Sequence, residues 1–162
     1  MKKNSILIIL LLLLSKNGLS QLVKIELQAT GLTCSMCSLS IQKQLQTIHE
    51  VDSIYTNIET STYFIRLKKN NNLTPNIFKE KVEKAGFFVG NFIATANIDV
   101  MDKNLYILID DCKLHNTEVK FQVIDKGFVT AKEFKKLSKQ YKSILTYTAN
   151  SENDFHIKLI EP

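Results

Sequence analysis

The chain has 162 residues, of which 44% are apolar and 23% are charged, with five glycines and two prolines. This balance excludes an intrinsically disordered, collagen-like or low-complexity protein, because enough apolar side chains are present to form a core. Three cysteines are too few for a disulfide-built scaffold or for a zinc site of four thiolates. Any cysteine chemistry in this chain therefore has to be local.

The amino terminus has the pattern of a secretory signal peptide. Lys2 and Lys3 precede nine consecutive aliphatic residues at 6–14, and a polar segment with small residues leads to Ser20. An apolar run of this length is much shorter than the roughly 20 residues that span a bilayer. We therefore expect residues 1–20 to be cleaved near Ser20, leaving a secreted or periplasmic protein without stable membrane insertion.

The formal net charge of +5 is concentrated in that first segment. Without residues 1–20, 18 basic side chains remain against 16 acidic ones, and the lysines are interleaved with acids. A nucleic-acid-binding surface needs basic residues gathered together, commonly beside aromatic residues. We therefore expect no nucleic-acid partner.

Residues 22–96 are expected to form one unit in which strands and helices alternate. In chain order, hydrophobic periodicity predicts a strand over 23–29, a helix over 37–48, strands over 51–58 and 61–68, a helix over 74–85 and a strand over 87–93. Thr74 is expected to cap the second helix and Pro75 to open it. Connection rules fold this β-α-β-β-α-β order into a four-stranded antiparallel sheet with both helices on one face.

Residues 98–162 are expected to form a smaller α+β unit. Strands are predicted over 104–109, 118–124, 143–148 and 154–160, the last two joined by a turn at 150–153. Thr130 and Glu133 form a capping box that opens a helix whose Phe134, Leu137 and Tyr141 point inward.

One face of that helix carries lysines at helical spacing: Lys132, Lys135, Lys136 and Lys139. Such a face either is a solvated surface or meets an acidic partner or an anionic membrane.

The chemistry of the chain is expected at Cys34 and Cys37, where a loop enters a helix. Free backbone N–H groups and the helix dipole favour negative charge there, so these thiols lose their protons more readily than a free cysteine. Two thiolates three positions apart can close on one ion, and soft sulfur ligands select Cu(I) and similar metals.

Other uses of a Cys-x-x-Cys pair fit the surrounding residues less well. Haem attachment needs His after the second cysteine, and position 38 is Ser. Structural zinc needs further ligands, and the chain offers only one more cysteine, Cys112. A thioredoxin-like site usually has a proline facing the thiols, whereas Pro75 is explained as a helix start. A disulfide or a buried apolar pair remains an alternative, since an exported protein meets oxidising conditions.

The loop Gly31-Leu32-Thr33-Cys34-Ser35-Met36-Cys37 resembles the Gly-Met-Thr-Cys-x-x-Cys loop of heavy-metal-associated domains, which occur in copper chaperones, metal-pumping ATPases and periplasmic mercury-binding proteins. The resemblance covers about residues 22–96 and includes the Ala-Gly-aromatic step at 85–87. It implies a ferredoxin-like fold with Cys34 and Cys37 as metal ligands.

The resemblance also implies roles for residues around the thiols. Gly31, Leu32 and Thr33 would support the metal loop, with Leu32 buried as its anchor in place of the family's commoner Met. Phe87 would be the aromatic residue that shields the site. The cargo would be Cu(I) first, with Hg2+, Zn2+ and Cd2+ as other soft ions, and the partner a metal-transporting ATPase or another thiol-containing metal carrier.

Two further groups have weaker metal-ligand patterns. Cys112 and His115 form a Cys-x-x-His that is either a weak second metal site or a lone thiol beside a surface histidine. Met36 lies between the thiols, where an exposed loop side chain is a simpler interpretation than a thioether ligand. His49 and His156 have no visible partners in the sequence and receive no assignment.

These observations lead to one main hypothesis and two alternatives. The main hypothesis is a secreted or periplasmic protein, not an enzyme and without catalytic residues, that binds or transfers a soft metal at Cys34 and Cys37. One alternative is a thiol-disulfide redox module that uses the same pair. The other is an envelope-binding module with a vestigial metal site, in which residues 98–162 carry the function.

Overall fold

The structure, a computed structural model, describes residues 22–110, 117–149 and 154–160. The expected signal peptide at 1–20, the pair Cys112 and His115, and the expected turn at 150–153 lie outside the described residues. Among the residues that are described, no helix is long and apolar enough to cross a membrane.

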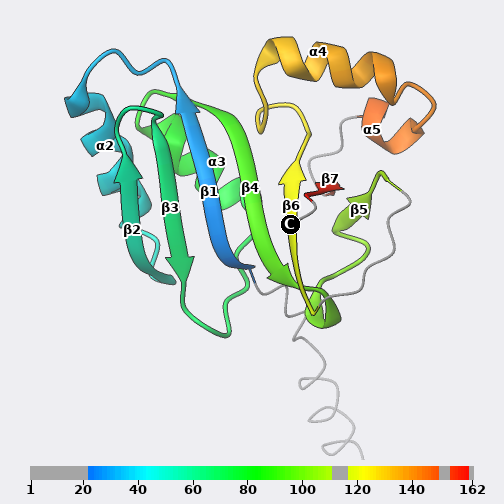
Figure 1. Ribbon diagram of the computed structural model, residues 1–162, viewed down its shortest axis with the longest axis horizontal. Helices are drawn as coiled ribbons and strands as arrows, with labels where there is room; N and C mark the ends of the chain where they lie inside the picture. The colour runs from blue at the N-terminus through cyan, green and yellow to red at the C-terminus, as the bar shows by residue number, and fades with distance from the viewer. Residues whose placement is uncertain (1–21, 111–116, 150–153, 161–162) are drawn as a thin grey trace, which may run out of the picture.

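The first unit has the element order that the sequence predicts. Its elements are β1 (Leu22–Thr30), α2 (Ser35–Leu45), β2 (Val51–Asn57), β3 (Thr62–Leu67), α3 (Pro75–Lys84) and β4 (Phe88–Asn97). β1 pairs antiparallel with both β3 and β4, and β2 pairs antiparallel with β3. Both helices lie behind the sheet in Figure 1. The α+β, ferredoxin-like architecture is confirmed.

The ends of α3 follow from three residues. Pro75 occupies the first helical position, where its missing N–H leaves no donor unpaired. Thr74 is the residue before it, as expected, but its side chain makes no capping hydrogen bond. Gly86 follows the helix with φ of +90°, a backbone conformation that glycine adopts without steric cost, so the helix ends there.

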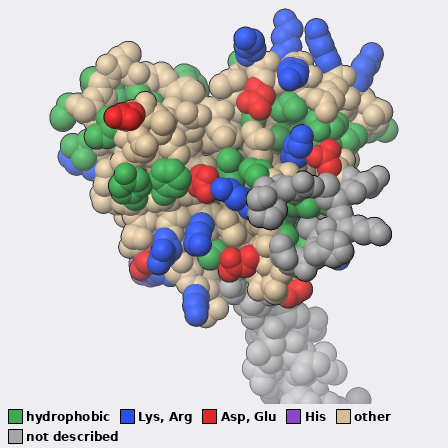
Figure 2. Space-filling model, viewed as in Figure 1, with side chains coloured by type: hydrophobic (Ala, Val, Ile, Leu, Met, Phe, Trp, Pro, Cys, Tyr) green, Lys and Arg blue, Asp and Glu red, His purple; other side chains and the backbone are tan. Residues whose placement is uncertain are grey.

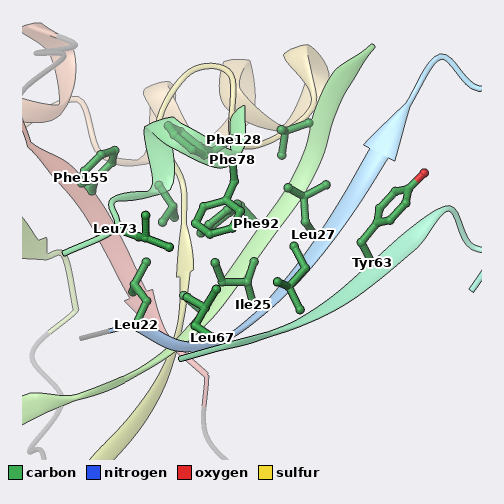
Figure 3. Packing of buried hydrophobic residues seen from close by; sticks show 14 of the residues in the cluster. Leu22, Ile25, Leu27, Tyr63, Leu67, Leu73, Phe78, Phe92, Phe128 and Phe155 are labelled. Carbon is green, nitrogen blue, oxygen red and sulfur yellow. The ribbon is translucent and has the colours of Figure 1, made fainter. Parts of the chain in front are cut away.

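The core lies between the sheet and these helices. Alternate residues of β1, Ile25 and Leu27, point into it together with Phe92 of β4 and Phe78 of α3, and all four are at most 1% exposed (Figure 3). Full burial of such a side chain contributes roughly 1.5–3 kcal/mol. The period-two pattern of β1 therefore has the expected consequence, one face buried and one exposed.

The second unit continues the same sheet. Its elements are β5 (Tyr106–Leu108), β6 (Glu118–Val123), α4 (Ala131–Gln140), α5 (Leu145–Ala149) and β7 (Phe155–Leu159), preceded by a short 3-10 turn, η1 (Ile98–Val100). β6 pairs antiparallel with β4 over Ile93–Asn97, which gives a seven-stranded sheet in the order β2-β3-β1-β4-β6-β7-β5.

A row of aromatic rings crosses the boundary between the two units. The ring centroids of Phe78 and Phe92 are 6.0 Å apart, those of Phe92 and Phe128 are 5.5 Å apart, and those of Phe128 and Phe155 are 5.7 Å apart. Phe78 and Phe92 belong to the first unit, whereas Phe128 and Phe155 belong to the second. Shared strand pairing and a shared aromatic core therefore join the two units.

The prediction of a strand over 143–148 is wrong, because Leu145–Ala149 form the short helix α5. Ile144, Leu145 and Tyr147 favour a strand by propensity, but tertiary contacts decide the conformation here. Tyr147 is buried and its hydroxyl donates to the carbonyl of Ile124, whereas Leu145 is 81% exposed. Tyr147 is the buried residue of this segment, whereas a strand with one buried face would bury every second residue.

Gly90 is the point where β4 lies closest to its surroundings. A Cβ atom at this position would clash with Cγ2 of Thr30 at the end of β1, and would lie 3.7 Å from Cγ2 of Thr130, the residue that caps α4. Glycine in a strand often marks such a close approach. The end of β1 that leads to the cysteine loop and the start of α4 therefore both lie close to a single glycine.

We predict that Gly90→Ala lowers the free energy of unfolding by about 1–3 kcal/mol, the usual cost of overpacking. Thr30→Ser removes the clashing methyl group and keeps the hydroxyl that donates to the carbonyl of Phe88. The double variant Thr30→Ser, Gly90→Ala should recover most of the loss in urea denaturation. A double variant as unstable as Gly90→Ala alone would contradict this explanation.

Candidate metal centre

The cysteine loop leaves β1 at Thr30 and enters α2 at Ser35. Gly31 has φ of +88°, and its Cβ position lies 3.9 Å from Cδ1 of Phe87, so the loop turns back against that ring. Leu32 is partly buried and packs against the core, while Thr33 is exposed. The loop is thus held at Leu32 and Phe87 and open at its tip.

The structure brings the two predicted thiols together. The Sγ atoms of Cys34 and Cys37 are 2.9 Å apart. Cys34 has extended backbone and is the residue before α2, and its carbonyl accepts a hydrogen bond from the N–H of Cys37 at 3.1 Å. Cys34 is exposed and Cys37 is partly exposed, both as free thiols. A single ion can therefore reach both sulfurs from solvent.

The surroundings favour the thiolate form of Cys37. Its pKa is lowered from 9.0 to about 7, first by the hydrogen bond from the Cys34 thiol and next by a backbone hydrogen bond from Thr33. The start of α2 supplies the same preference through its unpaired N–H groups, and the first turn contains no acidic residue that would oppose it. The lowered pKa increases the share of Cys37 that is ready to bind a metal or to react at neutral pH.

Tyr63 links β3 to the helix that carries Cys37, a role that was not predicted from the sequence. This residue of β3 is fully buried, and its hydroxyl donates to the carbonyl of Ser38 in α2 at 3.1 Å. The pKa of the Tyr63 hydroxyl is raised mainly by burial, and the nearby Cys37 charge raises it further. The inward alternation of Tyr63 and Ile65 was the signal available in the sequence, but it gave burial and not the partner.

Apolar side chains lie near the cysteine loop. Met36 is 69% exposed, and Phe88, which pairs with Thr30 at the end of β1, is 67% exposed. Met36 thus points to solvent, as its simpler interpretation required. Phe87 is partly buried and lies against the loop at Gly31, and its role in shielding the site stays a prediction from the resemblance.

Among the described residues, no third His, Cys, Asp or Glu side chain joins the two thiols. Across residues 22–110, 117–149 and 154–160, no group of three or more His, Cys, Asp or Glu side chains is arranged to hold a metal ion. A zinc site is almost always four-coordinate, whereas soft thiolates alone suit Cu(I).

His156, which the sequence left without a role, lies in a buried polar cluster of the second unit. Its ring Nδ1 is 2.8 Å from Oδ1 of Asp125, its Nε2 is 3.0 Å from the hydroxyl of Thr146, and its backbone N–H donates to Oδ2 of Asp125. The cluster ties β7 to α5 and to the segment after β6. We interpret it as a structural cluster, because every polar atom of the ring is satisfied within the fold.

Comparison with protein families places the cysteine loop in a known domain. Residues 26–88 match the model of the heavy-metal-associated domain. A search of curated proteins found no match.

Solved structures of similar domains were also found. The N-terminal domain of PacS from Synechocystis PCC6803 is 27% identical, with 41% of this chain and 91% of that chain covered and a TM-score of 0.36. The yeast copper transporter domain Ccc2a, in its apo and Cu(I)-loaded states, is 28% identical over 40% of this chain and 88% of that chain, with a TM-score of 0.36. The N-terminal domain of a potential copper-translocating P-type ATPase from Bacillus subtilis, in the Cu(I)-loaded state, is 27% identical, with 41% and 82% covered and a TM-score of 0.37.

We predict that Cys34→Ala raises the pKa of Cys37 toward its ordinary value of 9.0, because the Cys34 thiol makes the largest contribution to lowering it and alanine has no hydrogen-bond donor. The rate of alkylation of Cys37 by iodoacetamide should reach half of its maximum near pH 7 when Cys34 is present, and at clearly higher pH in Cys34→Ala. Cys112→Ser is included in the parent chain and in the variant, so that alkylation of the third thiol does not contribute to the measured rate. An unchanged midpoint would mean that Cys34 does not stabilise the thiolate.

Proposed function

We propose, from the match of residues 26–88 to the heavy-metal-associated domain, that the chain binds a soft metal ion at Cys34 and Cys37 and passes it to a partner. The ion is cargo, and the protein acts as a carrier and not as an enzyme. Domains of this family are metal-binding and transfer modules, which is the ground for extending that role to this chain.

The observation that carries the proposal is the state of the thiol pair. The two Sγ atoms lie 2.9 Å apart at the solvent-exposed start of α2, and the pKa of Cys37 is about 7. Metal binding by a thiol requires loss of its proton, so a lowered pKa reduces the cost of binding at neutral pH. Exposure gives the metal a path both in and out.

We propose Cu(I) as the cargo. Two thiolates without a third or fourth ligand among the described residues satisfy a soft ion of low coordination number, and leave Zn2+ two ligands short. Hg2+ and Cd2+ share the preference for sulfur and are expected to compete. The apolar side chains of Met36 and Phe88 beside the loop add no hard oxygen ligand.

Transfer would proceed by ligand exchange. A thiolate of the partner attacks the ion while both cysteines hold it, and one of the two sulfurs leaves before the other. Cys34, at the exposed tip, is more accessible than Cys37 in the first helical turn. The partner is a metal-transporting ATPase or another thiol-containing carrier, and the place of exchange is the periplasm or the exterior after removal of the signal peptide.

The lowered pKa of Cys37 also favours a second candidate, thiol-disulfide exchange, because the thiolate is the attacking species in that chemistry. Pro75, however, is explained as the first residue of α3, whereas a thioredoxin-like site usually has a proline that faces its thiols. The metal carrier is therefore the better-supported function.

Anaerobic titration of the reduced protein with Cu(I), against a chromogenic competitor, tests the proposal. We predict one Cu(I) per chain, and a loss of affinity of at least a thousandfold in the double variant Cys34→Ser, Cys37→Ser, since two charged soft ligands are replaced by neutral hydroxyl groups.

Two matched controls locate the site. Cys112→Ser removes the third thiol, and Met36→Leu removes the thioether between the ligands; both should bind Cu(I) as the parent chain does. Affinity that survives the double cysteine variant would refute the proposal. Loss of binding in Cys112→Ser would move the site away from the loop.

A further inference from the structure

The metal site makes no use of α4, whose outer face is the most strongly basic surface feature of the second unit. Lys132, Lys135, Lys136 and Lys139 recur at the spacing of one helical face, and all four are exposed. Figure 2 shows the corresponding basic side chains projecting from the top of the molecule over α4. Glu133 is the one acidic residue of this helix.

Among the described residues, none of these four lysines has an ion-pair partner. Within the described part of the chain, the ion pairs join Lys120 to Glu26 and His156 to Asp125, and none of them involves α4. Four positive charges held side by side on a helix repel one another. An anionic surface that faces them therefore gains more than it would from lysines scattered over the molecule.

The opposite face of α4 fixes its orientation. Phe134 and Leu137 are partly buried, and the ring of Phe134 lies 5.9 Å from that of the buried Tyr147. Thr130 caps the helix through a hydrogen bond from the N–H of Glu133. The helix is thus docked on the protein by its apolar side and presents the lysines outward as a fixed row.

The clustering of these charges favours a lipid surface. Four lysines on one face of an amphipathic helix match the pattern by which anionic lipid headgroups are recognised. Each basic residue near such a surface adds to binding without a specific geometry.

We propose that the lysine face of α4 binds anionic phospholipid membranes through their headgroups. The attraction is electrostatic and peripheral. It is independent of metal binding and is expected of the apo protein as well.

The position of α4 gives this binding a consequence for orientation. Thr130 at its start and Thr30, which leads into the cysteine loop, both lie close to Gly90. Figure 1 shows α4 and the loop between β1 and α2 at the same end of the sheet. A membrane bound by α4 therefore lies on the side of the molecule where Cys34 and Cys37 are exposed.

Sedimentation with vesicles tests the proposal on the chain that begins at residue 21, the expected product of signal-peptide cleavage. We expect binding to vesicles of phosphatidylglycerol, none to vesicles of phosphatidylcholine, and release when salt is raised, since salt screens charges at the surface. The variant Lys132→Gln, Lys135→Gln, Lys136→Gln, Lys139→Gln should lose roughly fivefold in partitioning for each lysine, or more than a hundredfold in total.

A charge-matched control separates a specific face from net charge. Lys43→Gln, Lys69→Gln, Lys84→Gln, Lys103→Gln removes the same charge from four exposed lysines elsewhere and should keep most of the binding. Equal losses in the two variants, or no binding of the parent chain to phosphatidylglycerol, would overturn the proposal. If the protein bound polyglutamate but not vesicles of phosphatidylglycerol, the result would overturn the proposal in favour of an acidic protein partner.

Discussion

The site depends on one interaction, the hydrogen bond between two thiols held together at the start of a helix. This interaction lowers the pKa of Cys37. Cys37 favours the thiolate because Cys34 donates a hydrogen bond to it and because backbone N–H groups face it. A thiolate is a metal ligand, a nucleophile and a redox centre. The fold therefore supplies a reactive group, and the number of neighbouring ligands, access and the oxidation state decide which reaction follows.

The fold holds the cysteine loop against the core on one side and leaves the thiols accessible to solvent on the other. Leu32 and Phe87 pack against the core, and Tyr63 fixes the carbonyl of Ser38 in the same helix as Cys37. The second unit adds β6 to the edge of β4, so a strand edge that would otherwise be free is paired. The start of α4 lies beside Gly90, close to the end of β1 that leads to the loop.

The first unit could be predicted well from the sequence because its signals agree with one another. Alternation in β1, Pro75 at a helix start and Gly86 at a helix end are local features that tertiary contacts did not override. The Cys-x-x-Cys spacing likewise placed both thiols at one helix start. By contrast, α5 was missed because a single buried residue, Tyr147, determines its conformation.

Contacts between distant segments were the other part that the sequence could not give. The pairing of β6 with β4 joins residues from separate predicted units, and no local pattern specifies which strand edge is used. The partners of Tyr63 and His156 are of the same kind, since each depends on a residue that only the fold brings near. Periodicity predicts that a side chain is buried, but not what it contacts.

The central claim is that Cys34 and Cys37 remain reduced and carry metal where the protein works. Elemental analysis together with thiol counting, on protein isolated from its own compartment without added reductant, tests this most directly. The account predicts a soft metal, with copper dominant, bound in proportion to the chain, and both thiols free once the metal is removed. Protein that holds no metal and carries a stable disulfide between Cys34 and Cys37 would contradict it.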